Sequence, residues 1–227
     1  MLYEDIIGEL KAMASPANVA GMARYGIITD KALGVSIYHL RPLARRIGID
    51  HDLAVRLWDS GIHEGRLLTG MIGDPAATTR RQADAWVRQF DSWDLCDQLC
   101  SNLLDRTPFA WEKAVQWAGR KGEFVKRAGF TMMACLAVHD KAAGDAAFRR
   151  LLPIIRREAA DERNFVKKAV NWALRNIGKR NLALNAAAVA EARRIARLDS
   201  RAARWIAADG LRELTGEKVL ARLRGKR

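Results

Sequence analysis

Apolar residues recur along the whole chain at the three- and four-residue spacing of amphipathic α-helices. Ile6, Ile7 and Leu10 lie on one face of the first such segment. Further segments with this spacing are Ser36–Ile47, the stretch after the capping candidate Asp50, Leu67–Ile72, 78–90, 92–105, 109–119, 123–138, 144–159, 162–178, 183–197, 200–214 and 217–223. No segment has the alternating pattern of a strand. The pattern predicts an all-α protein.

The breaks between these segments are short and contain residues that stop or cap helices. Examples are Gly48, Thr107-Pro108 and Asp199-Ser200. About a dozen short helices with short connections are typical of stacked helical hairpins.

An internal echo suggests how the hairpins stack. Phe124–Ala128 returns 41 residues later as Phe165–Ala169, and Arg201–Trp205 is a weaker third copy. A period near 40 residues is typical of HEAT and armadillo repeats. We therefore expect a superhelical solenoid of HEAT-like repeats. No Gly/Ser- or Pro-rich linker interrupts it, so residues 1–227 are interpreted as a single domain.

Each copy of the echo carries basic residues at one helical phase. Stacking would align Arg127, Lys168, and Arg201 or Arg204 as a basic stripe along one concave face, with Lys126 beside Arg127. Residues 1–110 contain 12 Lys and Arg against 14 Asp and Glu, whereas residues 111–227 contain 27 against 12. The whole excess of +13 therefore lies in the second half, which favours a polyanionic partner such as nucleic acid. The alternative is a solvated, arginine-rich surface.

The cysteines offer neither a disulfide framework nor a metal site. Cys96, Cys100 and Cys135 form no CxxC pair, and the four histidines are scattered. We interpret the three as buried thiols in a reducing cytosol, and we expect no metal and no cofactor. A leader and an apolar run near 18 residues are both missing, so we expect a cytosolic protein that neither is exported nor spans a membrane.

Two tryptophans are candidates for chemistry. Asp91 or Ser92 is a natural N-cap, which would place Trp93 and Asp97 one turn apart on one helix face. An indole and a carboxylate can together stabilise a developing cation. The alternatives are a packed core tryptophan and an aspartate that complements the helix dipole.

Trp172 presents a similar choice. It follows Lys168 by four residues, so it shares a helix face with that cation and could contact a sugar or a base. Its apolar neighbours also fit a tryptophan packed between repeats. Arg127 could be a solvated arginine or could bind a phosphate with its guanidinium fork.

An ordered set of segments resembles the AlkD-like DNA alkylation repair proteins. The set comprises Met22–Ile27, Leu33–Arg41, Leu57-Trp58, Glu64–Arg66, Ser92–Asp97, Phe124–Ala128 and Phe165–Arg175. The resemblance covers roughly residues 3–180. It implies a HEAT-like solenoid whose concave basic face holds duplex DNA, and a DNA glycosylase that removes positively charged N3- and N7-alkylated purines.

The resemblance also assigns roles to residues. Trp93 and Trp172 would be aromatic walls, Asp97 the catalytic carboxylate and Arg127 the arginine that binds the DNA backbone. Tyr25 matches a tyrosine near the same face. One departure is Ser92, because a second aromatic residue often precedes the tryptophan in this family.

One carboxylate can suffice for this chemistry. Ordinary glycosidases need a second carboxyl group to protonate the leaving group. An N3- or N7-alkylated purine already carries a positive charge and can leave without protonation, so the protein has only to stabilise the cationic sugar and place a water. The resemblance further suggests that the base stays stacked during excision. We expect the protein to act on duplex DNA as a monomer.

Two other classes remain open on the sequence. A non-catalytic binder of the DNA or RNA backbone would use the same basic stripe without excision. A protein–protein scaffold is the other alternative, because helical repeats commonly bind peptides.

Overall fold

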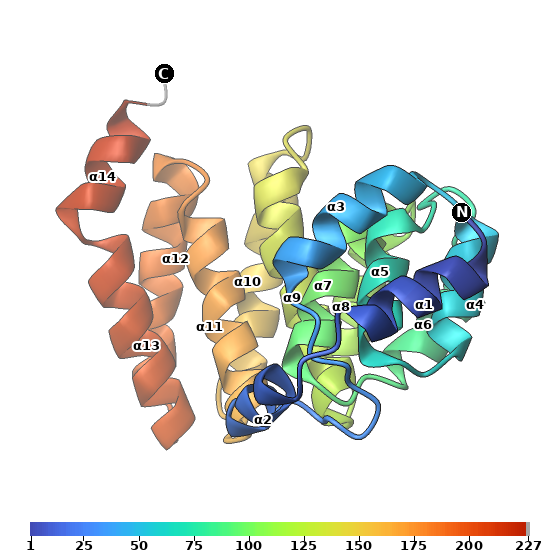
Figure 1. Cartoon of the computed structure of the whole chain (residues 1–227). Helices are drawn as coiled ribbons and strands as arrows, with labels where there is room; N and C mark the ends of the chain where they lie inside the picture. The colour runs from blue at the N-terminus through green and yellow to red at the C-terminus, as the bar shows by residue number, and fades with distance from the viewer. Residues whose placement is uncertain (226–227) are drawn as a thin grey trace. The chain divides into compact units, whose positions relative to one another are not determined.

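The computed structural model describes residues 1–225, which form fourteen α-helices, one 3-10 turn and no strand (Figure 1). The elements are α1 (Tyr3–Ala12), α2 (Pro16–Arg24), α3 (Ile37–Ile47), α4 (His51–Asp59), α5 (His63–Ile72), α6 (Arg80–Val87), α7 (Trp93–Asn102), η1 (Leu104–Arg106), α8 (Ala110–Ala118), α9 (Glu123–His139), α10 (Asp145–Glu158), α11 (Asn164–Gly178), α12 (Leu182–Ile195), α13 (Arg201–Leu214) and α14 (Glu217–Arg224). The all-helical prediction is confirmed.

Helix boundaries follow the predicted segments closely, and two predicted caps form. The Asp50 carboxylate accepts a hydrogen bond from the Leu53 amide at 3.0 Å, and the Ser200 hydroxyl accepts one from Ala203 at 3.1 Å. The pattern missed α2, which buries none of its residues and so has no apolar stripe to detect.

The described contacts divide the chain into two compact units, Met1–Pro108 and Phe109–Arg227, which we call the first and second units. The division falls where the charge changes. The first unit contains 12 Lys and Arg against 14 Asp and Glu, and the second contains 27 against 12. The single-domain interpretation of residues 1–227 stays a prediction.

In the first unit, aromatic residues anchor the core. The ring of Trp58 on α4 lies 5.3 Å from that of Trp86 on α6 and 6.2 Å from that of Phe90, measured between centroids. Both Trp58 and Trp86 are buried. Helices α5 and α7 pack directly on each other, which positions the start of α7.

In the second unit, α9 is the central helix and packs against both α8 and α11. Its middle is buried on every side, from Arg127 to Ala137. A Cβ atom on Gly129 would lie 2.2 Å from the backbone nitrogen of Ala118, so only glycine permits this close approach of α8 and α9.

The internal echo corresponds to real neighbours in space. The ring of Phe124 on α9 lies 5.5 Å from the ring of Phe165 on α11, which occupies the equivalent position of the next copy. Helix α13, which begins with the third copy at Arg201, packs in turn against α11 (Figure 1). The echo therefore marks a structural repeat.

Two further sequence interpretations meet the structure here. Cys96, Cys100 and Cys135 are all buried, as expected, and within residues 1–225 none of them takes part in a disulfide. Among residues 1–225, the helices include none that is both long enough and apolar enough to cross a membrane.

Candidate functional site

The candidate residues of the first unit lie at the start of α7. Trp93 is the first residue of this helix and Asp97 lies one turn later, as predicted. Both side chains are half-buried, so each keeps part of its surface open to a ligand. The indole N–H of Trp93 donates a hydrogen bond to the carbonyl oxygen of Tyr25 at 3.0 Å.

This bond brings Tyr25 and Trp93 together from opposite ends of the first unit. Tyr25 ends α2, and its side chain is 72% exposed. Both residues border the same cavity, so each offers an aromatic group on which a base or sugar could lie. The structure thus joins two residues that the sequence separates by 68 positions.

Ser92 holds the connecting loop in place. It occupies the predicted N-cap position of α7, but its hydroxyl does not cap the helix. Instead it accepts a hydrogen bond from the Ile28 amide at 3.0 Å and donates one to the Asp91 carboxylate at 2.9 Å. The small, buried serine that departs from the family pattern therefore ties the loop after α2 to α7.

A buried carboxylate fixes the other end of that loop. Glu64 on α5 is fully buried and accepts hydrogen bonds from the amides of Leu33, Gly34 and Val35 at 2.9, 2.6 and 3.1 Å. Gly34 has φ of +78°, and a Cβ there would lie 2.3 Å from the Ser15 carbonyl oxygen. In the sequence, Glu64–Arg66 is only one segment of the family resemblance, and no pattern shows that the Glu64 carboxylate binds the backbone amides of a loop. We call residues 26–36 the Glu64 loop.

The Glu64 loop and helices α2, α3, α5 and α7 enclose a cavity of about 510 Å³. Tyr25 and Trp93 border it, and its lining is mostly apolar, with His63, Asp94 and Gln98 among its polar groups. Cavities of this size and character are typical of small-molecule sites.

An ion pair between His63 and Asp94, which no sequence pattern predicted, lies in this cavity. Nε2 of His63 lies 2.8 Å from Oδ2 of Asp94. Burial lowers the pKa of His63, but the hydrogen bond and charge of Asp94, helped by Glu64 and Asp91, outweigh it, so the pKa is raised. The other oxygen of Asp94, Oδ1, is buried and forms no hydrogen bond to a described residue.

In the second unit, Arg127 is deeply buried, with 5% of its surface exposed. Its Nη1 donates a hydrogen bond to the carbonyl oxygen of Phe165 at 2.7 Å. Arg127 therefore ties α9 to the first turn of α11, three residues before Lys168. Its predicted contact with the DNA backbone stays a prediction, which must allow for this structural bond.

Lys126 is occupied by carboxylates of the same unit. Its ammonium lies 2.6 Å from Glu158 and 3.1 Å from Asp161, and its side chain is 13% exposed. The Arg163 guanidinium, followed by Lys126, holds the pKa of Asp161 at about 2, so the carboxylate is ionised at neutral pH. This pairing leaves Lys126 a weaker candidate for a phosphate contact than an unpaired lysine.

Lys168 and Trp172 have the placement expected of a binding surface. Lys168 is exposed and forms no ion pair with any residue in the described range, and Trp172 is half-buried one turn later on α11. A second aromatic–basic pair lies close by, because the ammonium of Lys167 sits 5.2 Å from the ring centroid of Trp205 on α13. Trp205 is 40% exposed, and in the sequence it stands out only as the last residue of the third copy of the echo.

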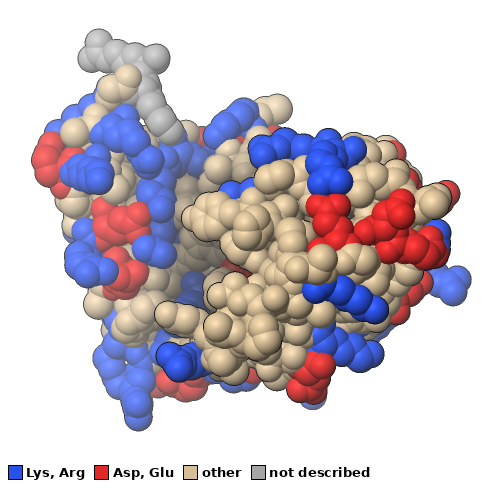
Figure 2. Space-filling view, in the orientation of Figure 1, with Lys and Arg blue, Asp and Glu red and all other residues tan. Residues whose placement is uncertain are grey.

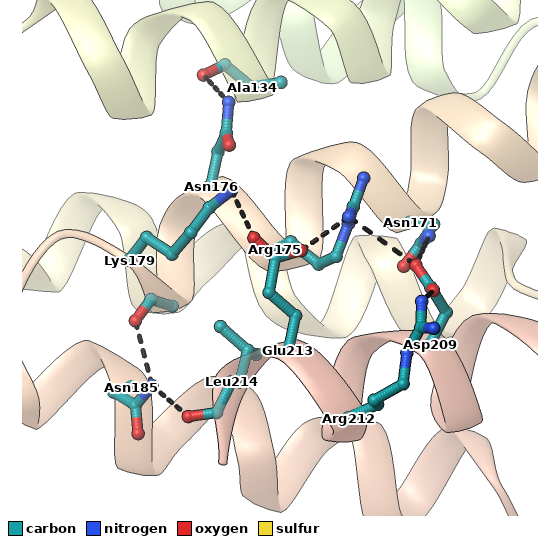
Figure 3. Close-up of polar contacts among 11 residues, drawn as sticks. Ala134, Asn171, Arg175, Asn176, Lys179, Asn185, Asp209, Arg212, Glu213 and Leu214 are labelled. Carbon is teal, nitrogen blue, oxygen red and sulfur yellow. Dashed lines mark hydrogen bonds and ion pairs between the residues drawn. The ribbon is translucent and has the colours of Figure 1, made fainter. Parts of the chain in front are cut away.

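A polar network holds α11 against α13 beside Trp172 (Figure 3). Asn171 donates to Asp209 at 2.7 Å, and Arg175 donates to Glu213 at 2.5 Å. Lys179 donates to the other oxygen of Glu213 at 2.8 Å. These bonds fix the side-chain orientation of the residues that flank Trp172 on α11 and so restrict the position of the helix.

Comparisons with known proteins bear on the family and the fold. The model of the DNA alkylation repair enzyme family matches residues 6–212. A solved structure is similar over 95% of this chain and 97% of its own, with a TM-score of 0.78 and 20% identity. It is described as a new family of proteins related to the HEAT-like repeat DNA glycosylases with affinity for branched DNA structures. The curated proteins contain no match.

The structural likeness shows that the predicted HEAT-like repeat fold is correct. The family match extends over nearly the whole chain, including both units and every candidate residue named above. The chain belongs to the DNA alkylation repair enzyme family.

Proposed function

We propose that this protein is a DNA N-glycosylase that excises positively charged N3- and N7-alkylated purines from duplex DNA. The observation that carries the proposal is the start of α7, where a half-exposed indole and a carboxylate lie one turn apart. The hydrogen bond from Trp93 to the Tyr25 carbonyl fixes the indole before any substrate arrives. Preorganised groups of this kind stabilise charge that develops in a transition state.

Excision of a cationic base requires no general acid from the protein. A cationic alkylpurine departs as a neutral base, so the electron pair of the glycosidic bond leaves with the purine and no proton is required. Asp97 would stabilise the positive charge that then grows on the deoxyribose, and Trp93 would add cation–π attraction. Water completes the hydrolysis at the anomeric carbon of the sugar.

The second unit supports the DNA part of the proposal. It contains 27 Lys and Arg against 12 Asp and Glu, which gives it a strongly positive field. Figure 2 shows Lys and Arg side chains over α13 and α14. Lys168 on α11 is the contact that we assign to the DNA strand, and Trp172 on the same helix keeps its proposed role as an aromatic wall. The roles of Arg127, Lys126 and Tyr25 in DNA binding are proposed with them.

The test is chromatography of bases released from duplex DNA that contains N7-methylguanine. The wild type should release this base, whereas Asp97→Asn should release it about a hundredfold more slowly, which is the scale of one preorganised electrostatic group. Asp52→Asn, an exposed aspartate in the first turn of α4, is the matched control and should behave as the wild type. Uracil, a neutral base whose departure needs an acid, should stay in place.

Equal release by Asp97→Asn and the wild type would refute the proposed chemistry. Binding of branched DNA without base excision would then be the favoured function, because the similar solved structure comes from a family with affinity for branched DNA structures. In that case the protein would bind a four-way junction more tightly than a duplex of equal length and would release no base from either.

A further inference from the structure

A cavity of about 400 Å³ in the second unit is lined by four cations. Lys141 follows α9, Lys179 and Arg180 follow α11, and Arg222 lies on α14. Asn176 and Asn181 also line it, with their amide groups donating to the Ala134 carbonyl oxygen and the Asp145 carboxylate, and none of the described residues that line the cavity is acidic. Four positive charges that converge from three parts of the fold need compensation by anions.

The cations that follow α11 have partial compensation. Arg180 donates to the carbonyl oxygens of Ala137 at 2.8 Å and Ala143 at 3.2 Å, and its Nε is buried without a hydrogen-bond partner among residues 1–225. Burial lowers the pKa of Arg180 more than the charges of Asp140 and Asp145 raise it. Its positive charge is thus incompletely balanced by the neighbouring carboxylates.

The remaining cations differ in their availability. Lys179 donates to Glu213, as Figure 3 shows, and so is partly neutralised. Lys141 and Arg222 are exposed, and neither forms an ion pair within the part of the chain that the structure describes. Their charges are free to meet an external anion at the cavity mouth.

The geometry points to a phosphate-binding site, and we infer that its phosphate belongs to a strand of DNA. A tetrahedral phosphate offers several oxygens to donors that arrive from different directions, and arginine forks match it well. Lys179, the C-cap of α11, lies eleven residues after Lys168 and about 16 Å further along the helix axis. One helix could therefore contact a strand at two separated phosphates. The DNA source rests on the proposed function, whereas the phosphate chemistry does not.

The test uses the full chain with the double variant Lys141→Gln/Arg222→Gln, because neither residue supports the fold through an ion pair. Arg180 is left intact, since it holds two backbone carbonyls. The matched control is Arg193→Gln/Arg197→Gln, which removes two exposed charges near the far end of α12. That end lies about 18 Å from the Asn181 end of the same helix.

The first measurement is an NMR titration with inorganic phosphate against chloride at equal ionic strength. The side-chain amide signals of Asn176 and Asn181 should shift in the wild type and in the control, and the cavity variant should bind phosphate at least about fivefold more weakly. Equal titrations in the two double variants would overturn the phosphate site.

The second measurement identifies the source of the phosphate through the salt dependence of duplex binding. Losing one phosphate contact should reduce the slope of log affinity against log salt by about one in the cavity variant relative to the control. An equal slope combined with weakened phosphate titration would refute the DNA strand as the source and assign the site to a free phosphate. Neither measurement depends on base release, so failure of the glycosylase proposal would be recognised separately.

Discussion

The two units are built from repeats of different length. In the first unit, three side-chain hydrogen bonds between successive repeats each join residues 31 positions apart. They are His51–Gln82, Trp58–Gln89 and His63–Asp94. Gln89 follows α6, and the helices that carry the other five residues have only 8–10 residues.

In the second unit, the corresponding spacing is longer. Three bonds between its repeats each join residues 38 positions apart, namely Arg127–Phe165, Asn171–Asp209 and Arg175–Glu213. Helices α9 to α13 have 14–17 residues. An increase of about five residues lengthens a helix by roughly 7 Å.

The two units also differ in charge. The second unit holds 27 of the 39 Lys and Arg residues, whereas the first is slightly acidic. The first unit instead holds one loop with the buried Glu64 carboxylate and contains the His63–Asp94 pair. We propose a division of work in which Asp97 and Trp93 of the first unit stabilise the cationic sugar and the basic residues of the second unit bind phosphate, with Trp172 as the second unit's contribution to base release.

The largest effect that we expect tests the basic unit. If about four phosphates are contacted, affinity for undamaged duplex should fall about a hundredfold between about 50 and 200 mM salt. Fluorescence anisotropy with a labelled duplex measures this directly. Affinity that stays flat over this range would exclude phosphate binding as the main force and favour a protein–protein scaffold.

The next effect concerns the Glu64 loop. Glu64→Gln places an amide N–H₂ group among three backbone N–H donors, so the free energy of unfolding should fall by about 2 kcal/mol. Chemical denaturation measures the loss, and Glu4→Gln, at an exposed position of α1, is the control. An unchanged unfolding midpoint would mean that the loop contributes little to stability.

Smaller effects should follow removal of either tryptophan. Trp93→Ala and Trp172→Ala should each slow base release by roughly tenfold, because a cation–π contact contributes on the order of 1 kcal/mol. Trp93→Phe keeps the ring face but loses the hydrogen bond to the Tyr25 carbonyl, so it separates the two contributions. Wild-type rates in both alanine variants would remove the aromatic groups from the mechanism.

The smallest effect is a pH dependence of stability. Because folding raises the pKa of His63 above its ordinary value of 6.5, the contribution of the His63–Asp94 pair is fully present below pH 6.5. It is lost as the pH rises through the raised, folded-state value. Denaturation of the wild type and His63→Gln across this range should show the decline only in the wild type, and a stability that rises there would contradict the sign.

The sequence predicted the features that depend on regular apolar spacing better than those that depend on contacts between distant side chains. It located most helices and the echo, since both depend on regular apolar spacing. It missed α2, which buries nothing, and it could not show that Lys126 is paired or that Arg127 is buried. Such pairings join residues about 30 to 40 positions apart, and no local pattern encodes them.

The candidate site divides in the same way. The motif around Trp93 and Asp97 was visible because both residues lie within one helical turn. The contact between Trp93 and Tyr25 and the role of Ser92 as a loop tether were not visible, because each depends on how the loop after α2 folds back. The four-cation cavity was not visible either, because its lining gathers residues from Ala137 to Arg222 that no local pattern relates.

The division of work between the units is tested most directly by single-turnover release of N7-methylguanine at saturating protein. Under this condition weak binding no longer limits the rate, so only chemistry is measured. We predict that Lys168→Gln, which weakens DNA binding, releases the base at the wild-type rate, whereas Asp97→Asn remains about a hundredfold slower. Equal rates for Asp97→Asn and the wild type, or a comparable defect in Lys168→Gln at saturation, would contradict the account.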